Sequence, residues 1–268
     1  MKTLAKILGC AAMLVSLSSF ASAQLAYTVS DKNGASPQEL FRFDINVCAA
    51  ENLGFINTAT EQEGLFSSGA VLFGYSENDA ALGTAEEQNP GTRILPPVPN
   101  APLGPNPNRA VCSFPGAAFG TESGAAYNPS DGYVYVVNSD DTIPAGQTRS
   151  RFSRFKPGCQ DFSVIGTSQL YIDGLAINNQ NQGFASDPRL TDRLYRFTPG
   201  PTLSLVQTSA TYGLATNEDS GLAWDFENDR LVLLLELGRV FFVNPTTGAA
   251  TLSCTLPIAT IGNDLEGL

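Results

Sequence analysis

Five short segments of the sequence place an acidic or hydroxyl side chain directly before a glycine. In chain order these residues are Glu63, Ser123, Asp173, Ser220 and Glu266. Carboxylate and hydroxyl oxygens are the ligands that a hard cation such as Ca²⁺ takes. If the segments meet around one axis, Glu63, Asp173 and Glu266 are the expected calcium ligands in a polar ring at a channel mouth. The alternative is that these side chains cap the starts of strands and are solvated.

The glycines of these segments recur at a nearly constant interval, which indicates a repeated structural unit. Gly64, Gly124, Gly174, Gly221 and Gly267 are separated by 60, 50, 47 and 46 residues. Periods of this size are typical of radial or stacked repeats. Near the axis of a radial fold strands crowd together, and glycine permits close backbone approach there.

A second register of similar strands agrees with this period. It comprises residues 40–44, 152–156, 194–198 and 240–244, in which buried and exposed positions alternate. An ordinary β-sandwich would not require both registers to recur. Two registers with one period therefore favour a ring of similar sheets.

The stretch 219–257 is the clearest copy of the unit. It predicts four short strands, at 221–224, 230–236, 239–244 and 250–256, with a turn at Asn-Pro-Thr-Thr-Gly. Four strands in about forty-five residues is the size of one β-propeller blade. We therefore predict an all-β fold, a β-propeller of about five four-stranded antiparallel blades.

The two ends of the chain predict one shared, closing blade. Residues 25–62 supply three strands, at 25–30, 40–45 and 53–57, and the missing first strand begins at Glu266. Pairing the first and last sheets removes open edges from a propeller. Because strands usually run to about five or six residues, we expect the closing strand to be truncated and the sequence to be a fragment.

The N-terminus predicts export. Two lysines precede an apolar run at 7–15, and Ala21-Ser22-Ala23 is a small-x-small cleavage site, so residues 1–23 are the expected signal peptide. The apolar run is too short to span a bilayer, and no later segment qualifies. The propeller domain is expected at 24–268, in the periplasm or outside the cell.

Removal of the signal peptide leaves four cysteines. They are Cys48, Cys112, Cys159 and Cys254. In an exported chain, four cysteines are typical of up to two disulfides, with three possible pairings. No C-x-x-C spacing supports a metal site, so we expect cysteines of neighbouring blades to pair.

A proline-rich segment at 90–107 breaks the period and accounts for the 60-residue first interval. Such a segment cannot sit in a central strand, so it is predicted to be a loop insertion on the surface with polyproline II character. A passive loop is the simpler interpretation, and an arm that docks a partner is the alternative.

Composition excludes several classes of function. The chain has 15 basic and 26 acidic residues, a net charge of −11, so its surface repels nucleic acid. Histidine is absent, which removes Ser-His-Asp and Cys-His catalysis and imidazole metal ligands. The sequence also has neither a P-loop nor a G-x-S-x-G elbow. The single tryptophan, Trp224, falls on an inner strand and is expected in the core, with ligand stacking as the alternative.

The pattern GLAxD…LYxF…P-x-x-G resembles exported bacterial β-propellers of the NHL, YVTN and related repeat groups. Residues 132–141, Gly-Tyr-Val-Tyr-Val-Val-Asn-Ser-Asp-Asp, are similar to a YVTN-type second strand. The resemblance covers 25–268 and rests on structural motifs. It implies a propeller, but these groups include binding proteins, scaffolds and some hydrolases.

The expected function is a non-catalytic binding or scaffold protein, with a protein, glycan or small-molecule ligand on its loop face. The alternative is a calcium-dependent hydrolase that resembles propeller lactonases and phytase-like esterases. Glu63, Asp173 and Glu266 would then be metal ligands, with Asn138 or Asn178 as companions, and Ca²⁺ is the one cofactor considered. Because the candidate residues recur with the repeat, and recurring positions usually serve the fold, binding is favoured.

Overall fold

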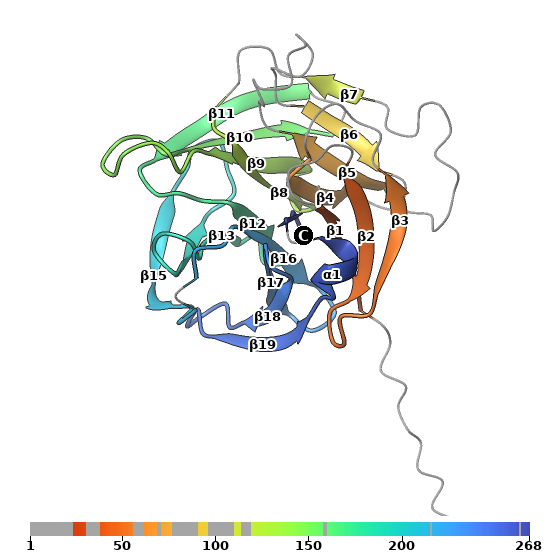
Figure 1. The fold of residues 1–268 in the computed structure, drawn as a ribbon. Helices are drawn as coiled ribbons and strands as arrows, with labels where there is room; N and C mark the ends of the chain where they lie inside the picture. The colour runs from red at the N-terminus through yellow and green to blue at the C-terminus, as the bar shows by residue number, and fades with distance from the viewer. Residues whose placement is uncertain are drawn as a thin grey trace, which may run out of the picture.

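The structure is a computed structural model. It describes residues 24–30, 38–55, 62–68, 71–76, 91–95, 110–113, 119–157, 160–214, 216–262 and 264–268. The predicted signal peptide lies outside these residues. Within them the chain forms five four-stranded antiparallel sheets around a central axis, so the predicted β-propeller is confirmed (Figure 1).

Each sheet runs from an inner strand near the axis to an outer strand at the rim (Figure 1). The closing blade contains β20 (Leu265–Glu266), β1 (Leu25–Ser30), β2 (Glu39–Asp44) and β3 (Ala50–Phe55). Blade 2 contains β4 (Gly64–Ser68), β5 (Val71–Ser76), β6 (Gly91–Leu95) and β7 (Ala110–Ser113). Blade 3 contains β8 (Glu122–Asn128), β9 (Tyr133–Ser139), β10 (Ser150–Lys156) and β11 (Gln160–Ser168).

The remaining two blades follow the same order. Blade 4 contains β12 (Gly174–Ile177), β13 (Gly183–Asp187), β14 (Arg193–Phe197) and β15 (Leu205–Thr211). Blade 5 contains β16 (Ser220–Asp225), β17 (Arg230–Leu235), β18 (Arg239–Val243) and β19 (Ala250–Thr255). In the described part of the chain the one helix is α1 (Ile258–Ile261), a short segment between β19 and β20.

The closing blade joins the two ends of the described chain, as predicted. β20 pairs antiparallel with β1 through Val29 opposite Glu266 and Ser30 opposite Leu265. On its other side β1 pairs with β2 along its whole length. The chain order therefore makes β1, β2 and β3 the second, third and fourth strands of a sheet whose inner strand comes from the other end of the sequence.

Apolar side chains form a separate core at each interface between neighbouring blades. On β17, Leu231 and Leu233 pack toward blade 4, whereas Val232 and Leu234 pack toward the closing blade. Side chains alternate between the two faces of a strand, so a strand between two sheets is apolar on both faces. This explains why β17 reads as a continuous apolar run rather than as an alternating pattern.

A disulfide crosses the seam where the ring closes. Cys48, in the turn after β2, is bonded to Cys254 on β19, and their Cα atoms are 5.7 Å apart. The two cysteines belong to neighbouring blades, which confirms that part of the prediction. The side chains of Cys112 and Cys159 lie outside the described residues, so their pairing stays a prediction.

The predicted loop insertion needs a correction at its start. Residues Gly91–Leu95 form β6, the third strand of blade 2, and pair with β5 and β7. The prolines of the segment flank this stretch but do not enter it, so the backbone N–H groups of the strand remain available to the sheet. The rest of the predicted insertion, 96–107, lies outside the described residues.

Candidate functional site

Five glycines close the channel of the propeller. A Cβ on Gly124 would lie 2.6 Å from the backbone oxygen of Asp173, and one on Gly267 would lie 2.3 Å from that of Glu63. The other three, Gly64, Gly174 and Gly221, also touch the next blade. The void among these ring glycines is about 10 Å³, roughly the room of one water molecule. The close approach predicted for them is confirmed, and it divides the channel into two ends.

The residue before each ring glycine lies at one end of the channel, which we call the polar end. The exposed fractions are 3% for Glu63, 4% for Ser123, 3% for Asp173 and 6% for Ser220. Glu266 is partly buried. The alternative that these side chains are solvated caps is therefore wrong for the first four, because the neighbouring blades cover them.

Asp173 is a deeply buried carboxylate of the polar end. Its Oδ1 accepts hydrogen bonds from Ser220 Oγ at 2.8 Å and from Ser186 Oγ at 3.2 Å. Its Oδ2 has no hydrogen-bond partner among the described residues. Burial raises the pKa of Asp173 well above its ordinary value, and the nearby charge of Asp219 adds to this shift. Asp173 thus links blade 4 to blade 5 while it keeps one oxygen unused.

Glu266 and Gln62 are held in the seam between the closing blade and blade 2. Gln38 Nε2 donates to Glu266 Oε2 at 3.1 Å, and Gln38 Oε1 accepts from the backbone N–H of Gln62 at 2.7 Å. Thr28 Oγ1 donates to the backbone oxygen of Glu266 at 2.9 Å. These contacts give the end of β20 a role in closing the ring.

The predicted calcium ring is not assembled by these contacts. Calcium takes six to eight oxygen ligands. In the described part of the chain, no group of three or more Asp, Glu or Cys side chains is placed to hold a metal ion. Binding of Ca²⁺ by Glu63, Asp173 and Glu266 stays a prediction.

The two asparagines considered as companions of the ring lie apart from each other. Asn138 is on β9, and its Oδ1 accepts from Tyr75 Oη at 2.9 Å. Asn178 follows β12, whereas Asp173 precedes that strand, so the two residues lie at opposite ends of it. Asn178 Oδ1 accepts the backbone N–H of Gln180 at 3.0 Å and so caps the turn that ends the strand. Its place does not suit a shared site with Asp173.

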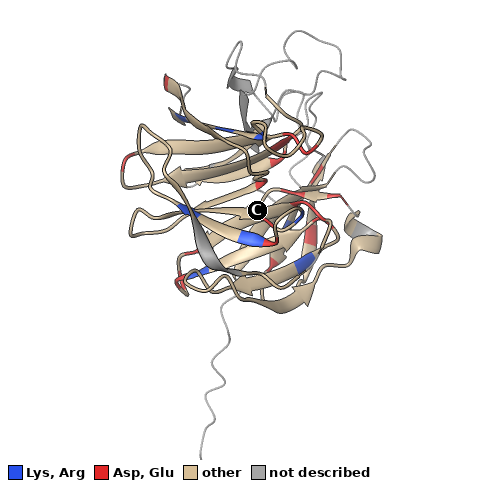
Figure 2. Ribbon diagram, turned by 90° about the vertical axis from the view of Figure 1, so that its left-hand side faces the viewer, with Lys and Arg blue, Asp and Glu red and all other residues tan. Residues whose placement is uncertain are grey.

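An ionic network beside the polar end was not predicted from the sequence. Arg189 Nη1 donates to both oxygens of Asp219, at 3.0 and 2.7 Å, and Tyr171 Oη donates to Asp219 Oδ1 at 2.7 Å. Arg189 also pairs with Asp141 at 2.7 Å. Asp and Glu residues, red in Figure 2, occur both near the axis and at the rim. These partners come from separate loops, so no local sequence signal could have joined them.

The opposite end of the channel, which we call the apolar mouth, holds two adjoining cavities. Their volumes are about 330 Å³ and about 310 Å³. The residues that line both are Leu65, Phe66, Ser67, Ala223, Trp224, Phe226 and Leu268. The first cavity is bordered in addition by residues 24–27, and the second by residues of β8 and β12.

Trp224 and Phe226 are the large aromatic groups of the fifth blade at this mouth. Trp224 is 8% exposed and stacks on Phe184, with ring centroids 5.4 Å apart. Its Nε1 has no hydrogen-bond partner among the described residues. Phe226 is 52% exposed, which is unusual for so large an apolar side chain. Trp224 thus belongs to the core, as expected, and it also lines both cavities.

The inner strands end at this mouth through a repeated turn. Asn128 and Asp225 stand four residues after their ring glycines, and each accepts a backbone N–H two residues later, at 3.1 Å. Asn178 does the same in blade 4. Such Asx turns redirect the chain away from the axis. The apolar mouth is therefore lined by the ends of the inner strands, together with Phe226 and Leu268, which follow β16 and β20.

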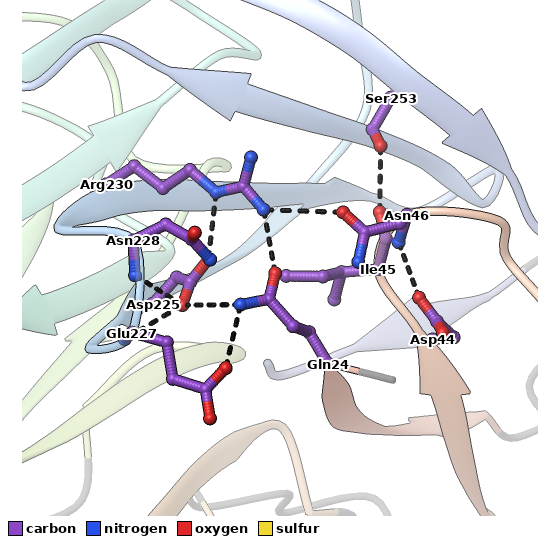
Figure 3. A network of polar contacts seen from close by, with 9 residues as sticks. All are labelled: Gln24, Asp44, Ile45, Asn46, Asp225, Glu227, Asn228, Arg230 and Ser253. Carbon is purple, nitrogen blue, oxygen red and sulfur yellow. Dashed lines mark hydrogen bonds and ion pairs between the residues drawn. The ribbon is translucent and has the colours of Figure 1, made fainter. Parts of the chain in front are cut away.

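A polar cluster borders the first cavity where the start of β1 meets blade 5 (Figure 3). Gln24 Nε2 donates to Glu227 Oε2 at 3.1 Å, and Arg230 Nη2 donates to Gln24 Oε1 at 2.9 Å. Arg230 Nε also pairs with Asp225 Oδ2 at 2.8 Å. The hydrogen bonds from Asn228 and Arg230 outweigh burial and lower the pKa of Asp225. The rim of the first cavity therefore carries the carboxylates of Asp225 and Glu227, with the guanidinium of Arg230 paired to Asp225.

Comparison with known proteins supports the fold. No protein-family model matches the sequence, and no curated protein does. A solved structure provisionally described as a gluconolactonase is 13% identical, with a TM-score of 0.53, and the match covers 88% of this chain and 80% of that one. A protein of unknown function from Bacteroides thetaiotaomicron is 14% identical, with a TM-score of 0.45. The match covers 85% of this chain but only 50% of that protein's length.

The described residues contain no helix long and apolar enough to cross a membrane.

Proposed function

We propose that this chain is an exported, non-catalytic β-propeller that binds an apolar ligand at the apolar mouth. The observation that carries the proposal is the pair of adjoining cavities, of about 330 and 310 Å³. Ligand pockets are usually concave, mostly apolar and about 300–1,000 Å³ in volume, with a few polar groups that orient the ligand. The polar cluster around Gln24 and Asp225 supplies such groups at one border.

The distribution of polar contacts supports a binding role. At the polar end, Ser220 of blade 5 donates to Asp173 of blade 4, and Gln38 of the closing blade accepts from the backbone N–H of Gln62 beside blade 2, so these polar groups join neighbouring blades. At the apolar mouth, Phe226 is exposed and the indole Nε1 of Trp224 has no partner in the described part of the chain. Aromatic rings that combine an apolar face with a free donor are suited to contact a ligand.

A fluorescence titration tests this proposal, because Trp224 is the only tryptophan. N-phenyl-1-naphthylamine, a neutral aromatic probe that accepts energy from tryptophan, should quench Trp224 emission in a saturable way. Phe226→Ala should weaken binding of the probe roughly tenfold, since it removes an apolar contact of about 1–2 kcal/mol. Val206→Ala is the matched control, because Val206 is similarly exposed, at 61%, but lies on the outer strand β15. Absence of saturable quenching would contradict the proposal.

The second candidate is a calcium-dependent hydrolase. It is favoured by the buried Asp173 carboxylate, whose Oδ2 has no partner among the described residues. In this case Ca²⁺ should raise the melting temperature, and a chelator or Asp173→Asn should remove the increase. Hydrolysis of an aldonolactone that depends on calcium would favour the hydrolase, whereas indifference of the melting temperature to calcium would reject it.

A further inference from the structure

Gln24 is held at the seam between the closing blade and blade 5 (Figure 3). Its backbone oxygen accepts the N–H of Ile45 at 2.9 Å, which continues the pairing of β1 with β2 by one residue. Its side chain extends across the seam to the turn between β16 and β17. These contacts join Gln24 to the end of β2 and to blade 5, so the anchoring of this residue is independent of β20.

Both ends of the side-chain amide of Gln24 are engaged. The oxygen Oε1 accepts from Arg230 Nη2 at 2.9 Å, and the nitrogen Nε2 donates to Glu227 Oε2 at 3.1 Å. Arg230 is itself fixed, because its Nε pairs with Asp225 and its guanidinium lies 3.4 Å from the centre of the Phe242 ring. Hydrogen bonds to charged groups are stronger than those between neutral groups. The amide is therefore held in one orientation against blade 5.

Gln24 is also the expected first residue of the mature protein. Ala21-Ser22-Ala23 is the expected cleavage site, so removal of residues 1–23 gives Gln24 a free α-amino group. A glutamine in this position can cyclise to pyroglutamate. Its α-nitrogen attacks the side-chain carbon Cδ, the N–Cδ bond forms as the Cδ–Nε2 bond breaks, and Nε2 takes a proton from the attacking nitrogen and leaves as ammonia. The product carries no terminal charge and no side-chain NH₂ group.

We propose that Gln24 is a modification site at the mature amino terminus, and that the native fold keeps it in the open glutamine form. Ring closure requires the amide to turn back onto its own α-nitrogen, so the contacts with Arg230 and Glu227 must break first. The lactam also lacks the N–H that Nε2 donates to Glu227. Because two contacts with charged groups oppose the reaction, cyclisation is coupled to local opening of the seam.

The state of Gln24 matters for the first cavity, because this residue is part of its lining. Cyclisation removes the positive charge of the α-ammonium group and the contact with Glu227. The modification would therefore change both the charge and the contacts at one border of the cavity.

Mass spectrometry of the protein, exported with its own residues 1–23, tests the proposal. The purified protein should begin at Gln24 in the open form, which differs from pyroglutamate by the mass of one ammonia. The rate of cyclisation is then measured for the native protein and for protein unfolded in guanidinium chloride, at the same pH and temperature. We expect the native protein to cyclise more slowly by about tenfold or more, which corresponds to about 1.4 kcal/mol.

Two variants in one turn identify the contact responsible. Glu227→Ala removes the acceptor of Gln24 Nε2 and should speed cyclisation of the native protein roughly three- to tenfold. Asp229→Asn is the matched control, because it also removes one carboxylate from this turn, and no hydrogen bond given for the described residues joins Asp229 to Gln24. Asparagine tolerates the φ of 53° at this position, so the control should cyclise at the rate of the original protein.

The possible results separate this inference from the proposed function. A mature protein that begins at another residue, or that is isolated entirely as pyroglutamate, overturns the inference. Equal rates for native and unfolded protein, or equal effects of the two variants, overturn it as well. None of these measurements involves a ligand. Saturable quenching of Trp224 by the neutral probe, together with rapid cyclisation of the native protein, would therefore reject this inference and leave the proposed function standing.

Discussion

Blade 5 and the closing blade have the same strand order but differ at the inner position. In blade 5 the six residues of β16 pair with β17, from Ser220 opposite Leu235 to Asp225 opposite Arg230. In the closing blade β20 contributes two paired residues, and the neighbouring edge of β1 opens into the first cavity. The comparison shows that the first cavity lies beside the one inner strand that pairs with its neighbour through only two residues.

The largest effect should come from a feature that both blades share, the glycine constriction. Gly124→Ala would place a Cβ 2.6 Å from the backbone oxygen of Asp173, so two blades must separate. We expect the free energy of unfolding to fall by about 3 kcal/mol or more, measured by urea denaturation. Gly146→Ala is the control: it is left-handed at φ 88° with nothing within 4 Å, and should cost only about 1 kcal/mol. Equal losses would show that the constriction is not tightly packed.

The next effect concerns the seam that holds the closing blade to blade 5. Replacing Cys48 and Cys254 by alanine opens a link between residues 206 positions apart. We expect the free energy of unfolding to fall by about 2–4 kcal/mol, and reduction of the original protein to have a similar effect. Unchanged denaturation after both treatments would mean that strand pairing alone closes the ring. Mass spectrometry of unreduced peptides also tests the second predicted pair, Cys112 and Cys159.

A smaller effect, the dependence of the free energy of unfolding on pH, should arise from Asp173 at the polar end. Because the folded pKa of Asp173 is raised by burial, the unfolded chain loses its proton first as pH rises above about 4. The wild type should therefore lose stability with rising pH, by about 1.4 kcal/mol for each pKa unit of the shift. Asp173→Asn should remove this dependence of the free energy of unfolding on pH, measured in protein treated with a chelator. If the free energies of unfolding of wild type and variant change in parallel from pH 4 to 8, the account is contradicted.

The sequence predicts the features that depend on short-range periodicity. The ring glycines and the strands of blade 5 recur at fixed spacing, and 221–224 and 230–236 were placed within one residue of β16 and β17. The sharing of the closing blade between the two ends of the chain was also predicted, because residues 25–62 supply only three of its four strands. These predictions depend only on the order and spacing of residues along the chain.

Features that depend on packing between distant segments could not be predicted. Burial of Glu63 and Asp173 is set by the neighbouring blades, and the bond between Arg189 and Asp219 joins separate loops. The strand β6 was missed because flanking prolines dominated the pattern of its segment. The left-handed φ of Gly267 sets it apart from the other four ring glycines, and the sequence cannot reveal this difference because all five positions hold the same residue type.

Amide hydrogen exchange along β1, followed by NMR without any ligand, most directly tests the central claim that blade 5 and the closing blade differ at the inner position. The N–H groups of Ala26 and Thr28 face β2, and that of Val29 is paired with β20, so all three should exchange slowly. Those of Leu25 and Tyr27 should exchange faster by roughly a hundredfold, because they point away from β2 and β20 does not reach them. Uniform protection from Leu25 to Val29 would show that the inner position is filled as in blade 5, and would contradict the account.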